Sequence, residues 1–246
     1  MSLSVEGLQF PGAIGTVGQH SAKLARSVYA GDVARLLREA IVGGQIPRGT
    51  PLVETRLAEQ LAVSRGPIRS ALQVLAGEGL VETRSNGRTV CVWSGHDDLS
   101  DLVRVRFELE RTALEWGMAS GLDTTILEKS FEALMAEGAS TQNLVELDID
   151  FHHALMGLSR SRFLIGAWLS IAPVIHSVIT IGNRNLVAKD PESNYERIIT
   201  SHRDILTAIT AHDLEAASDL LAKQFTFGRS VFEEHLTENT AGTDDA

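Results

Sequence analysis

Hydrophobic residues in the first third of the chain recur at the three- and four-residue spacing of amphipathic helices. The first run stops at Gly43-Gly44, a shorter helix is expected over Glu54–Leu61, and a third follows a tight turn. Ser64 is suited to cap this third helix because its hydroxyl can accept a free backbone N–H, and Pro67 lies in the first turn, where a missing N–H costs little. The apolar positions on the inward faces of the first and third helices are Val33, Leu36, Leu37, Ala40, Ile41, Ile68, Ala71, Leu72 and Leu75.

Two short β-prone runs follow the third helix, over Leu80–Arg84 and Thr89–Trp93. The dipeptide Asn86-Gly87 lies between them, and Asn-Gly is the strongest short-range signal for a β-hairpin because both residues tolerate positive φ. Helix, short helix, helix and hairpin therefore follow one another in about 65 residues, which is the order of a winged helix-turn-helix.

From Ser94-Gly95 to about Leu236 the pattern is helical throughout. Breaks are expected near Gly121-Leu122-Asp123, Gly138, Ser159-Arg160-Ser161, the stretch from Gly182 to Pro191, and His212-Asp213. The sequence thus predicts a mainly α protein, in which a winged helix-turn-helix precedes an all-α bundle of about six or seven helices. The expected domain bounds are residues 28–94 and 96–237, with flexible tails over residues 1–27 and 238–246.

The charge is distributed unevenly along the chain. The whole chain carries a net charge of −10, but residues 1–93 carry +3 and the remainder −13. This asymmetry is expected when only one end of a protein contacts phosphates.

A stretch over Phe163–Gly182 contains no charged residue and is long enough to cross a bilayer. Pro173 and several polar residues interrupt it, so a buried central helix is the preferred interpretation. The N-terminal segment lacks the pattern of a secretory signal, and the single cysteine, Cys91, excludes an intramolecular disulfide. We therefore expect a cytoplasmic protein without a membrane span.

Arginines mark the predicted third helix and the hairpin. Arg65 and Arg69 lie four residues apart and therefore share a helix face near its N-terminus, the part of a recognition helix that faces the major groove. Arginine donates to guanine and also pairs with phosphate. Arg84 and Arg88 flank the turn of the hairpin, which can contact the DNA backbone or minor groove as a wing. Each feature alone is also typical of a solvated basic surface, but their order favours DNA binding.

The segment Leu57–Leu72, which reads LAEQLAVSRGPIRSAL, resembles the characteristic core of the GntR superfamily winged helix, L-A-x-x-L-x-V-S-R-x-P-[IV]-R-x-A-L. Thr55 departs from the family, which often has an arginine there that helps to hold the DNA. The resemblance implies a DNA-binding surface around the third helix and the wing. We assign to this surface Ser64, Arg65, Pro67, Arg69, Arg84, Asn86, Gly87 and Arg88.

The C-terminal part resembles the FCD domain of the FadR branch of this superfamily, so that the whole resemblance covers roughly residues 29–236. Three segments carry it: Val105–Glu110, Asp148–Leu155 with the pattern D-x-x-F-H-x-x-L, and Ser201–Ile209 with the pattern H-x-x-I-L-x-A-I. FCD domains often recognise small organic acids.

Asp148 and His152 are spaced i, i+4 and project from one helix face, while His202 belongs to a later helix. A carboxylate and imidazoles from facing helices form a candidate site for a divalent metal such as Zn²⁺ or Ni²⁺. The resemblance implies a third histidine, but Gln224 stands at the matching position and offers at best a weak oxygen ligand. Direct binding of an effector by buried histidines is the alternative interpretation.

Candidate effector-binding residues are Arg106, Arg184 and Gln224. Arg106 is the first candidate for a carboxylate clamp because guanidinium pairs with carboxylate in bidentate geometry. An ion pair between Arg106 and Glu110, at i and i+4, is the alternative. The uncharged stretch fits the apolar wall of such a pocket.

These observations predict a bacterial transcription regulator, in particular a ligand-responsive repressor that binds an inverted-repeat operator as a homodimer. Its effector would be a small carboxylate bound in the C-terminal domain. The alternative function is a metal-dependent hydrolase that uses Asp148, His152 and His202. The sequence contains none of the common nucleophile, zinc-protease or phosphate-loop motifs, so we do not expect an enzyme.

Overall fold

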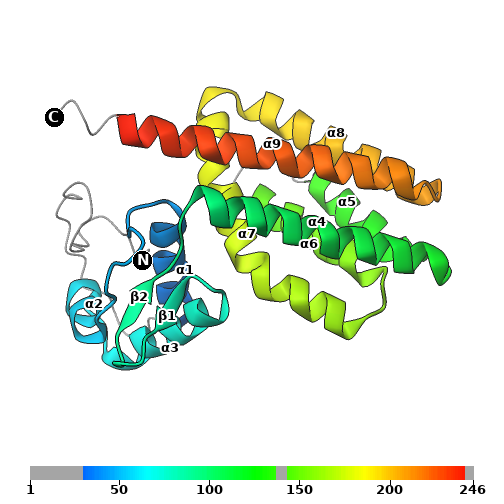
Figure 1. The fold of residues 1–246 in the computed structure, drawn as a ribbon. Helices are drawn as coiled ribbons and strands as arrows, with labels where there is room; N and C mark the ends of the chain where they lie inside the picture. Colours follow the sequence, from blue (N-terminus) through cyan, green and yellow to red (C-terminus); the bar gives the residue numbers. More distant parts are fainter. Residues whose placement is uncertain (1–29, 137–142, 242–246) are drawn as a thin grey trace. The chain divides into compact units, whose positions relative to one another are not determined.

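The computed structural model describes residues 30–136 and 143–241. The chain divides into two compact units, one reaching to Asp98 together with the end of the chain from Leu236, and the other spanning Leu99–His235. Over the described ranges it forms nine helices and one two-stranded sheet (Figure 1), which confirms the predicted mainly α fold. The predicted N-terminal tail and the expected break at Gly138 lie outside these ranges. The last helix continues to Ala241, past the predicted start of the C-terminal tail at residue 238.

The first unit contains the predicted order of three helices and a hairpin. Its elements are α1 (Ala30–Val42), α2 (Glu54–Leu61), α3 (Arg65–Gly77), β1 (Val81–Thr83) and β2 (Thr89–Cys91). Ala62, at φ 53°, makes the tight turn between α2 and α3. Backbone N–H groups at this turn donate to the carbonyl oxygens of Ala58 and Glu59 at the end of α2. Ser64 occupies the N-cap position of α3, but its side chain makes no capping hydrogen bond, contrary to the sequence prediction.

Apolar contacts hold α1 and α3 together, since Leu37, Ile41, Ile68 and Leu75 are all almost completely buried. A bidentate ion pair reinforces this packing. Arg38 on α1 donates from Nε and Nη2 to both carboxylate oxygens of the residue that follows α3, Glu78, at 2.7 and 2.6 Å. The pair fixes the end of α3 and therefore the direction in which this helix presents its N-terminus.

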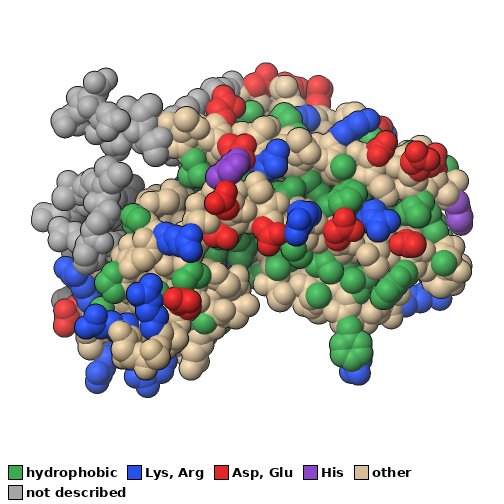
Figure 2. Space-filling model, viewed as in Figure 1, with side chains coloured by type: hydrophobic (Ala, Val, Ile, Leu, Met, Phe, Trp, Pro, Cys, Tyr) green, Lys and Arg blue, Asp and Glu red, His purple; other side chains and the backbone are tan. Residues whose placement is uncertain are grey.

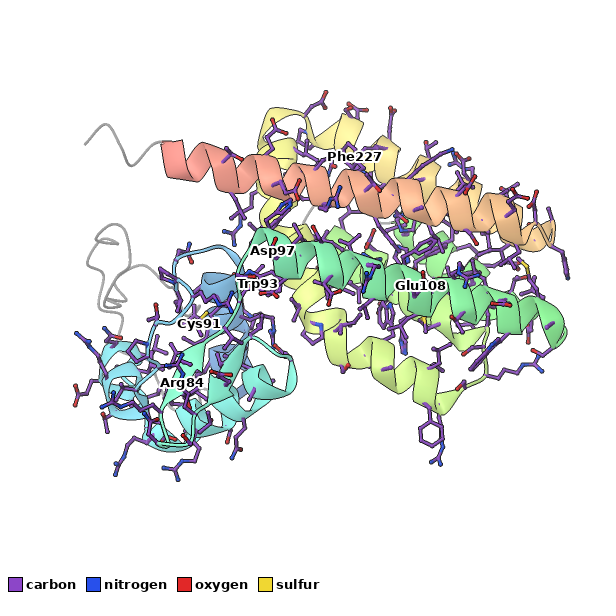
Figure 3. The ribbon with its side chains drawn as sticks, in the orientation of Figure 1. Arg84, Cys91, Trp93, Asp97, Glu108 and Phe227 are labelled. Atoms are coloured by element: carbon purple, nitrogen blue, oxygen red, sulfur yellow. The ribbon has the colours of Figure 1, made fainter. Side chains whose placement is uncertain are left out.

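The hairpin is antiparallel, with Thr83 paired to Thr89. Its strands are shorter than predicted. Gly87, at φ 77°, is the turn residue in the left-handed region, although the Asn-Gly pattern is compatible with positive φ at Asn86 as well. Asn86 instead accepts a hydrogen bond from the backbone of Arg88 through Oδ1. Cys91, labelled in Figure 3, is the last residue of β2, and burial of its side chain raises the pKa of the thiol.

The second unit is a helical bundle. Its elements are α4 (His96–Ala119), α5 (Thr125–Ala136), α6 (Leu144–Gly157), α7 (Arg162–Lys189), α8 (Pro191–Thr210) and α9 (Leu214–Ala241). The predicted breaks near residues 121, 160 and 212 are confirmed. Packing of α5 with α6 and α8, and of α7 with α6 and α8, surrounds one apolar core that includes Phe151, Leu155 and Trp168.

The break predicted from Gly182 to Pro191 is wrong for its first part, because α7 continues to Lys189 and ends at Asp190. Gly182 lies inside the helix, where α9 comes close. A Cβ atom at this position would lie 3.4 Å from the Cα of Phe232. Glycine here serves close packing of two helix backbones and does not end the helix.

Helix α7 includes the uncharged stretch, and by length and composition alone Arg162–Arg184 could cross a membrane. Trp168 of this helix is nevertheless fully buried in the bundle and donates from Nε1 to Glu110 of α4 at 3.0 Å. This helix therefore packs into the bundle with part of its surface. Since 39% of its most apolar window is buried and Phe163 is 75% exposed, the buried central helix expected from the sequence is only partly confirmed.

Candidate functional site

The first unit presents its arginines on the surface. Arg65, Arg69, Arg84 and Arg88 are all exposed, and Figure 2 shows Lys and Arg side chains gathered over this unit. Ser64, Asn86 and Gly87 are also exposed, and Pro67 is half-buried. The residues predicted to contact DNA thus lie at the start of α3 and on the hairpin turn.

Arg69 is held by an ion pair within the unit. Its Nε and Nη2 donate to the carboxylate of Glu54 on α2, at 3.0 and 2.8 Å. The hydrogen bond and charge of Arg69 lower the pKa of Glu54 below its ordinary value. Because the pair is solvent-exposed, it contributes little to stability. It does orient the guanidinium on the exposed face of α3 that the sequence predicts to contact DNA.

The predicted metal ligands come together in the bundle. Asp148 and His152 lie one turn apart on α6, and His202 reaches them from α8. All three are buried, and their candidate ligand atoms lie within 4.8 Å of one another. The contact between Nε2 of His202 and Oδ1 of Asp148 is 3.2 Å.

Hydrogen bonds determine which imidazole nitrogen faces the cluster. Nδ1 of His202 lies 2.7 Å from the carbonyl oxygen of Ile198, and since a carbonyl oxygen only accepts, Nδ1 donates. Nδ1 of His152 likewise donates to Oε2 of Glu110 at 2.7 Å. In their neutral forms both rings therefore carry a lone pair on Nε2. Nε2 of His152 is buried without a hydrogen-bond partner among the residues that the structure describes.

The electrostatics favour ionised carboxylates beside a neutral imidazole. Burial opposes the charge of Asp148, but the hydrogen bond and charge of a protonated His202 outweigh it and lower the pKa of Asp148 well below its usual range. Burial also opposes the charge of Glu110, while His152 and Arg106 lower its pKa overall. Burial lowers the pKa of His152 more than Glu110 raises it. Ionised carboxylates and a neutral His152 suit metal binding, and a cation would displace the Nε2 proton through which a protonated His202 pairs with Asp148.

This donor set fits a divalent metal. Two ligands on a tetrahedral zinc ion, each about 2.1 Å from it, lie about 3.4 Å apart, close to the 3.2 Å between Nε2 of His202 and Oδ1 of Asp148. A cation between Asp148, His152 and His202 would use three buried acceptors and leave a fourth position for a bound acid. It would also give Nε2 of His152 a partner.

Gln224 of α9 lies beside the same cluster. Its Nε2 is 3.3 Å from Nε2 of His202, and its Oε1 is buried without a partner within the described part of the chain. An amide has no imidazole nitrogen, so the bundle offers two imidazoles and one carboxylate as the strong ligands. Two other histidines lie apart from them, since His153 stacks on Trp168 and His176 faces Glu146.

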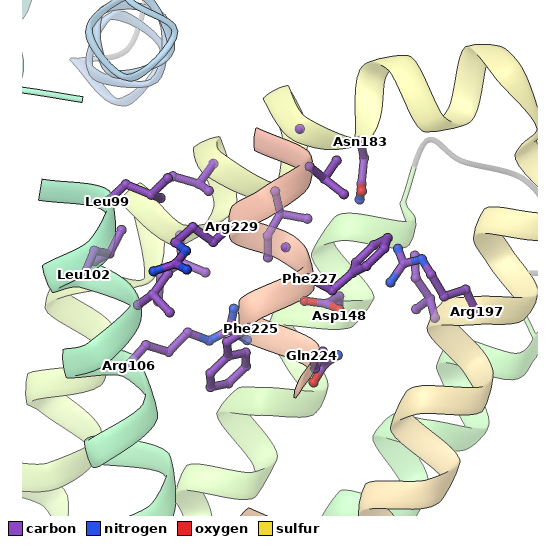
Figure 4. A pocket seen from close by; sticks show the side chains of 18 residues that line it. Leu99, Leu102, Arg106, Asp148, Asn183, Arg197, Gln224, Phe225, Phe227 and Arg229 are labelled. Atoms are coloured by element: carbon purple, nitrogen blue, oxygen red, sulfur yellow. The ribbon is translucent and has the colours of Figure 1, made fainter. Parts of the chain in front are cut away.

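A cavity of about 730 Å³, including its mouth, adjoins the cluster (Figure 4). Asp148, Gln224, Arg106 and Arg197 are among its lining residues, and the remaining wall is mostly apolar, with side chains of α4, α7 and α9. The cavity thus combines the buried carboxylate of Asp148 with three arginines, the third being Arg229 of α9.

Arg106 makes the ion pair that the sequence left open as the alternative, and it also lines the cavity. Its Nε donates to Oε1 of Glu110 at 2.9 Å, and its guanidinium lies 4.0 Å from the ring centroid of Phe225. Its Nη2 is buried and has no hydrogen-bond partner in residues 30–136 and 143–241. The ion pair therefore leaves the NH₂ group of Nη2 available to an acidic ligand.

The prediction for Arg184 is not supported by the geometry. Arg184 is exposed and is not among the lining residues, whereas the preceding residue, Asn183, lines the cavity. Successive residues of a helix point about 100° apart, so only one of the two can face inward.

Sequence reasoning missed Arg197 of α8. It lines the cavity, donates to Asn194 at 2.8 Å and lies 4.3 Å from the ring centroid of Phe227. Burial lowers the pKa of its guanidinium. The sequence around it gives no motif, and only the packing of α8 against α9 turns it toward the cavity.

Comparisons with known proteins agree with both units. Residues 29–91 match the family described as bacterial regulatory proteins, gntR family, and residues 101–226 match the FCD domain. The second match covers about half of the chain.

Curated relatives are regulators of operons. The chain is 28% identical over 210 residues to a protein named probable D-xylose utilization operon transcriptional repressor of Paenarthrobacter nicotinovorans, covering 82% of this chain and 87% of that protein. It is also 28% identical over 207 residues to the gluconate operon transcriptional repressor of Bacillus licheniformis, covering 82% and 84%.

Among solved structures, the fold resembles that of Lar, a regulator of the Listeria monocytogenes agr system, with a TM-score of 0.64 at 18% identity, covering 86% of this chain and 99% of that chain. The families and relatives give no support to the hydrolase alternative. The chain therefore belongs to the GntR family of bacterial regulatory proteins, in the group with a C-terminal FCD domain, and is a DNA-binding transcription regulator rather than an enzyme.

Proposed function

We propose that this regulator is a repressor whose operator binding is controlled by a small carboxylate bound in the cavity of the bundle. The observation that carries the proposal is that a buried cluster suited to a cation adjoins, through Asp148, a cavity lined by arginines. Acceptor atoms of Asp148, His152 and His202 suit a cation, and N–H groups of Arg106 and Arg197 suit an anion.

The three acceptor residues would hold Zn²⁺ or Ni²⁺, and the carboxylate would complete the coordination while pairing with Arg106. A bound metal ion would supply a positive charge that draws the acid into the apolar cavity. The arginines would orient the acid, and the wall of α7 and α9 would exclude water. Gln224 would contact the acid through its amide.

The operator is proposed to be an inverted repeat bound by a homodimer. One unit offers a single α3 helix and a single hairpin, and two copies related by a two-fold axis would read two half-sites in the major groove. A regulator of this kind acts on DNA in the cytoplasm, and the burial of Trp168 supports assigning α7 to the core.

Thermal melting tests the ligand class. We expect small carboxylates, with D-gluconate as the first probe because of the gluconate-operon relative, to raise the melting temperature of the full chain loaded with Zn²⁺ or Ni²⁺. Ligand at 100 times its Kd stabilises the folded state by about 2.7 kcal/mol. At this chain length each kcal/mol corresponds to roughly 2 to 4 °C. The neutral sugar D-xylose, which cannot pair with the arginines, should shift the melt much less.

The same melts after chelation separate two modes of binding. A shift that requires metal supports coordination by Asp148, His152 and His202 despite Gln224. A shift that survives chelation assigns binding to Arg106 and hydrogen bonds alone. If the neutral sugar stabilised the protein and no carboxylate did so, the proposed ligand class would be wrong.

A further inference from the structure

Glu110 is a carboxylate at 0% exposure in the centre of the bundle, and it touches neither the solvent nor the cavity. Three donors surround it. Oε1 accepts from Nε of Arg106 at 2.9 Å and from Nε1 of Trp168 at 3.0 Å, and Oε2 accepts from Nδ1 of His152 at 2.7 Å. Burying a charge in this way is costly even when it is paired, and an apolar residue of similar volume often replaces such a network without loss of stability. Fold stability alone therefore does not explain a charged residue at this position.

The hydrogen bond to His152 determines the chemistry of the opposite edge of that ring. An ionised carboxylate can only accept, so Nδ1 of the neutral imidazole must carry the proton. The lone pair is then on Nε2, which is buried without a partner among the described residues and belongs to the cluster with Asp148 and His202. In the other tautomer an N–H group would point into the cluster and exclude a cation.

His202 achieves the same tautomer by a different means, since its Nδ1 donates to a carbonyl of its own helix, one turn earlier. His152 has no such bond to α6, and its tautomer depends on a residue of α4. The two imidazoles are thus set independently, and only His152 relies on a side chain that a single substitution can change.

We propose that Glu110 is the positioning residue of the metal site, which keeps His152 in the tautomer whose Nε2 lone pair faces Asp148 and His202. Arg106 and Trp168 hold the carboxylate in place for this task. The inference rests on the metal site proposed above, but the tautomer itself exists in the metal-free protein and can be observed there.

A Glu110→Gln substitution discriminates between a positioning role and a structural one. The amide keeps the size of the side chain but offers one acceptor and one donor group. With its oxygen toward Arg106 and Trp168, its NH₂ group faces Nδ1 of His152, which must then accept, and the ring proton moves to Nε2. Turning the amide over would set its NH₂ group against two donors, which is less favourable.

The first readout is the tautomer of His152 in metal-free protein, observed by long-range ¹H–¹⁵N NMR of histidine-labelled full chain and assigned with a His152→Gln variant. We expect the proton on Nδ1 in the wild type and on Nε2 in Glu110→Gln. The second readout is the affinity for Zn²⁺, which should fall by roughly 10- to 100-fold in Glu110→Gln, the range found when a group that orients a metal-binding histidine is removed.

Trp168→Phe is the matched control. It removes a donor from the same carboxylate but leaves the Oε2 bond to His152 intact, so the tautomer and the Zn²⁺ affinity should stay as in the wild type even if the protein melts earlier. A wild-type His152 with its proton on Nε2 would overturn the inference, and so would a folded Glu110→Gln protein with unchanged tautomer and affinity. If the wild type bound no Zn²⁺ yet showed the expected tautomers, the proposed metal function would fail and the positioning role of Glu110 would stand.

Discussion

Replacing Arg69 by alanine is expected to weaken binding to the operator by roughly 5- to 150-fold, because a bidentate contact from arginine to a base is worth about 1–3 kcal/mol. Arg69 is exposed on the first turns of α3, and Glu54 already orients its guanidinium. The measurement is fluorescence anisotropy with an operator selected from random DNA by the full chain, at fixed salt concentration. The same titration should give two chains per operator.

A Glu54→Gln variant is the control for this experiment. It removes the charge that Arg69 pairs with but leaves Arg69 available to DNA, so operator affinity should be kept or increased. Equal affinities of the wild type and Arg69→Ala for the selected operator would remove Arg69 from the DNA-binding surface. Equal losses in both variants would assign Arg69 the role of linking α2 to α3.

Replacing His202 by alanine is expected to lower the affinity for Zn²⁺ by more than about 100-fold. Removal of a metal-coordinating imidazole should cost more than the 10- to 100-fold that follows loss of an outer partner. The imidazole is completely buried and lies 3.2 Å from Asp148. Titration against a competing chelator gives the affinity directly.

His153→Ala is the matched variant on α6, because His153 is exposed and stacks on Trp168 outside the cluster. Its Zn²⁺ affinity should equal that of the wild type. Similar affinities in His202→Ala and the wild type would show that any bound Zn²⁺ lies elsewhere.

Local patterns were sufficient to predict the DNA-binding unit. The helix over Glu54–Leu61 has the bounds expected from its apolar spacing, and the position of Gly87 marked the hairpin turn. Asp148 and His152 were predicted to share a helix face because their i, i+4 spacing fixes this within one helix. In these cases neighbours in the sequence decide the structure.

The remaining features depend on contacts between distant helices. Gly182 was predicted as a helix break, but the close approach of α9 explains the glycine. Arg197 lines the cavity because α8 packs against α9. Glu110 supports His152 because α4 lies against α6. Asn183 lines the cavity and Arg184 does not, because of how α7 is rotated about its axis. A long uncharged stretch does not specify this rotation.

The central claim is that the cavity of the bundle controls DNA binding. Its most direct test is the operator affinity of the Zn²⁺-loaded full chain, measured with and without the acid that raises the melting temperature most, in the wild type and in His202→Ala. We predict that the acid changes wild-type affinity by about 5- to 150-fold, the usual range of coupling between sites, and leaves His202→Ala at its acid-free affinity. An acid that binds the wild type without changing its operator affinity, or that changes both proteins equally, would contradict the account.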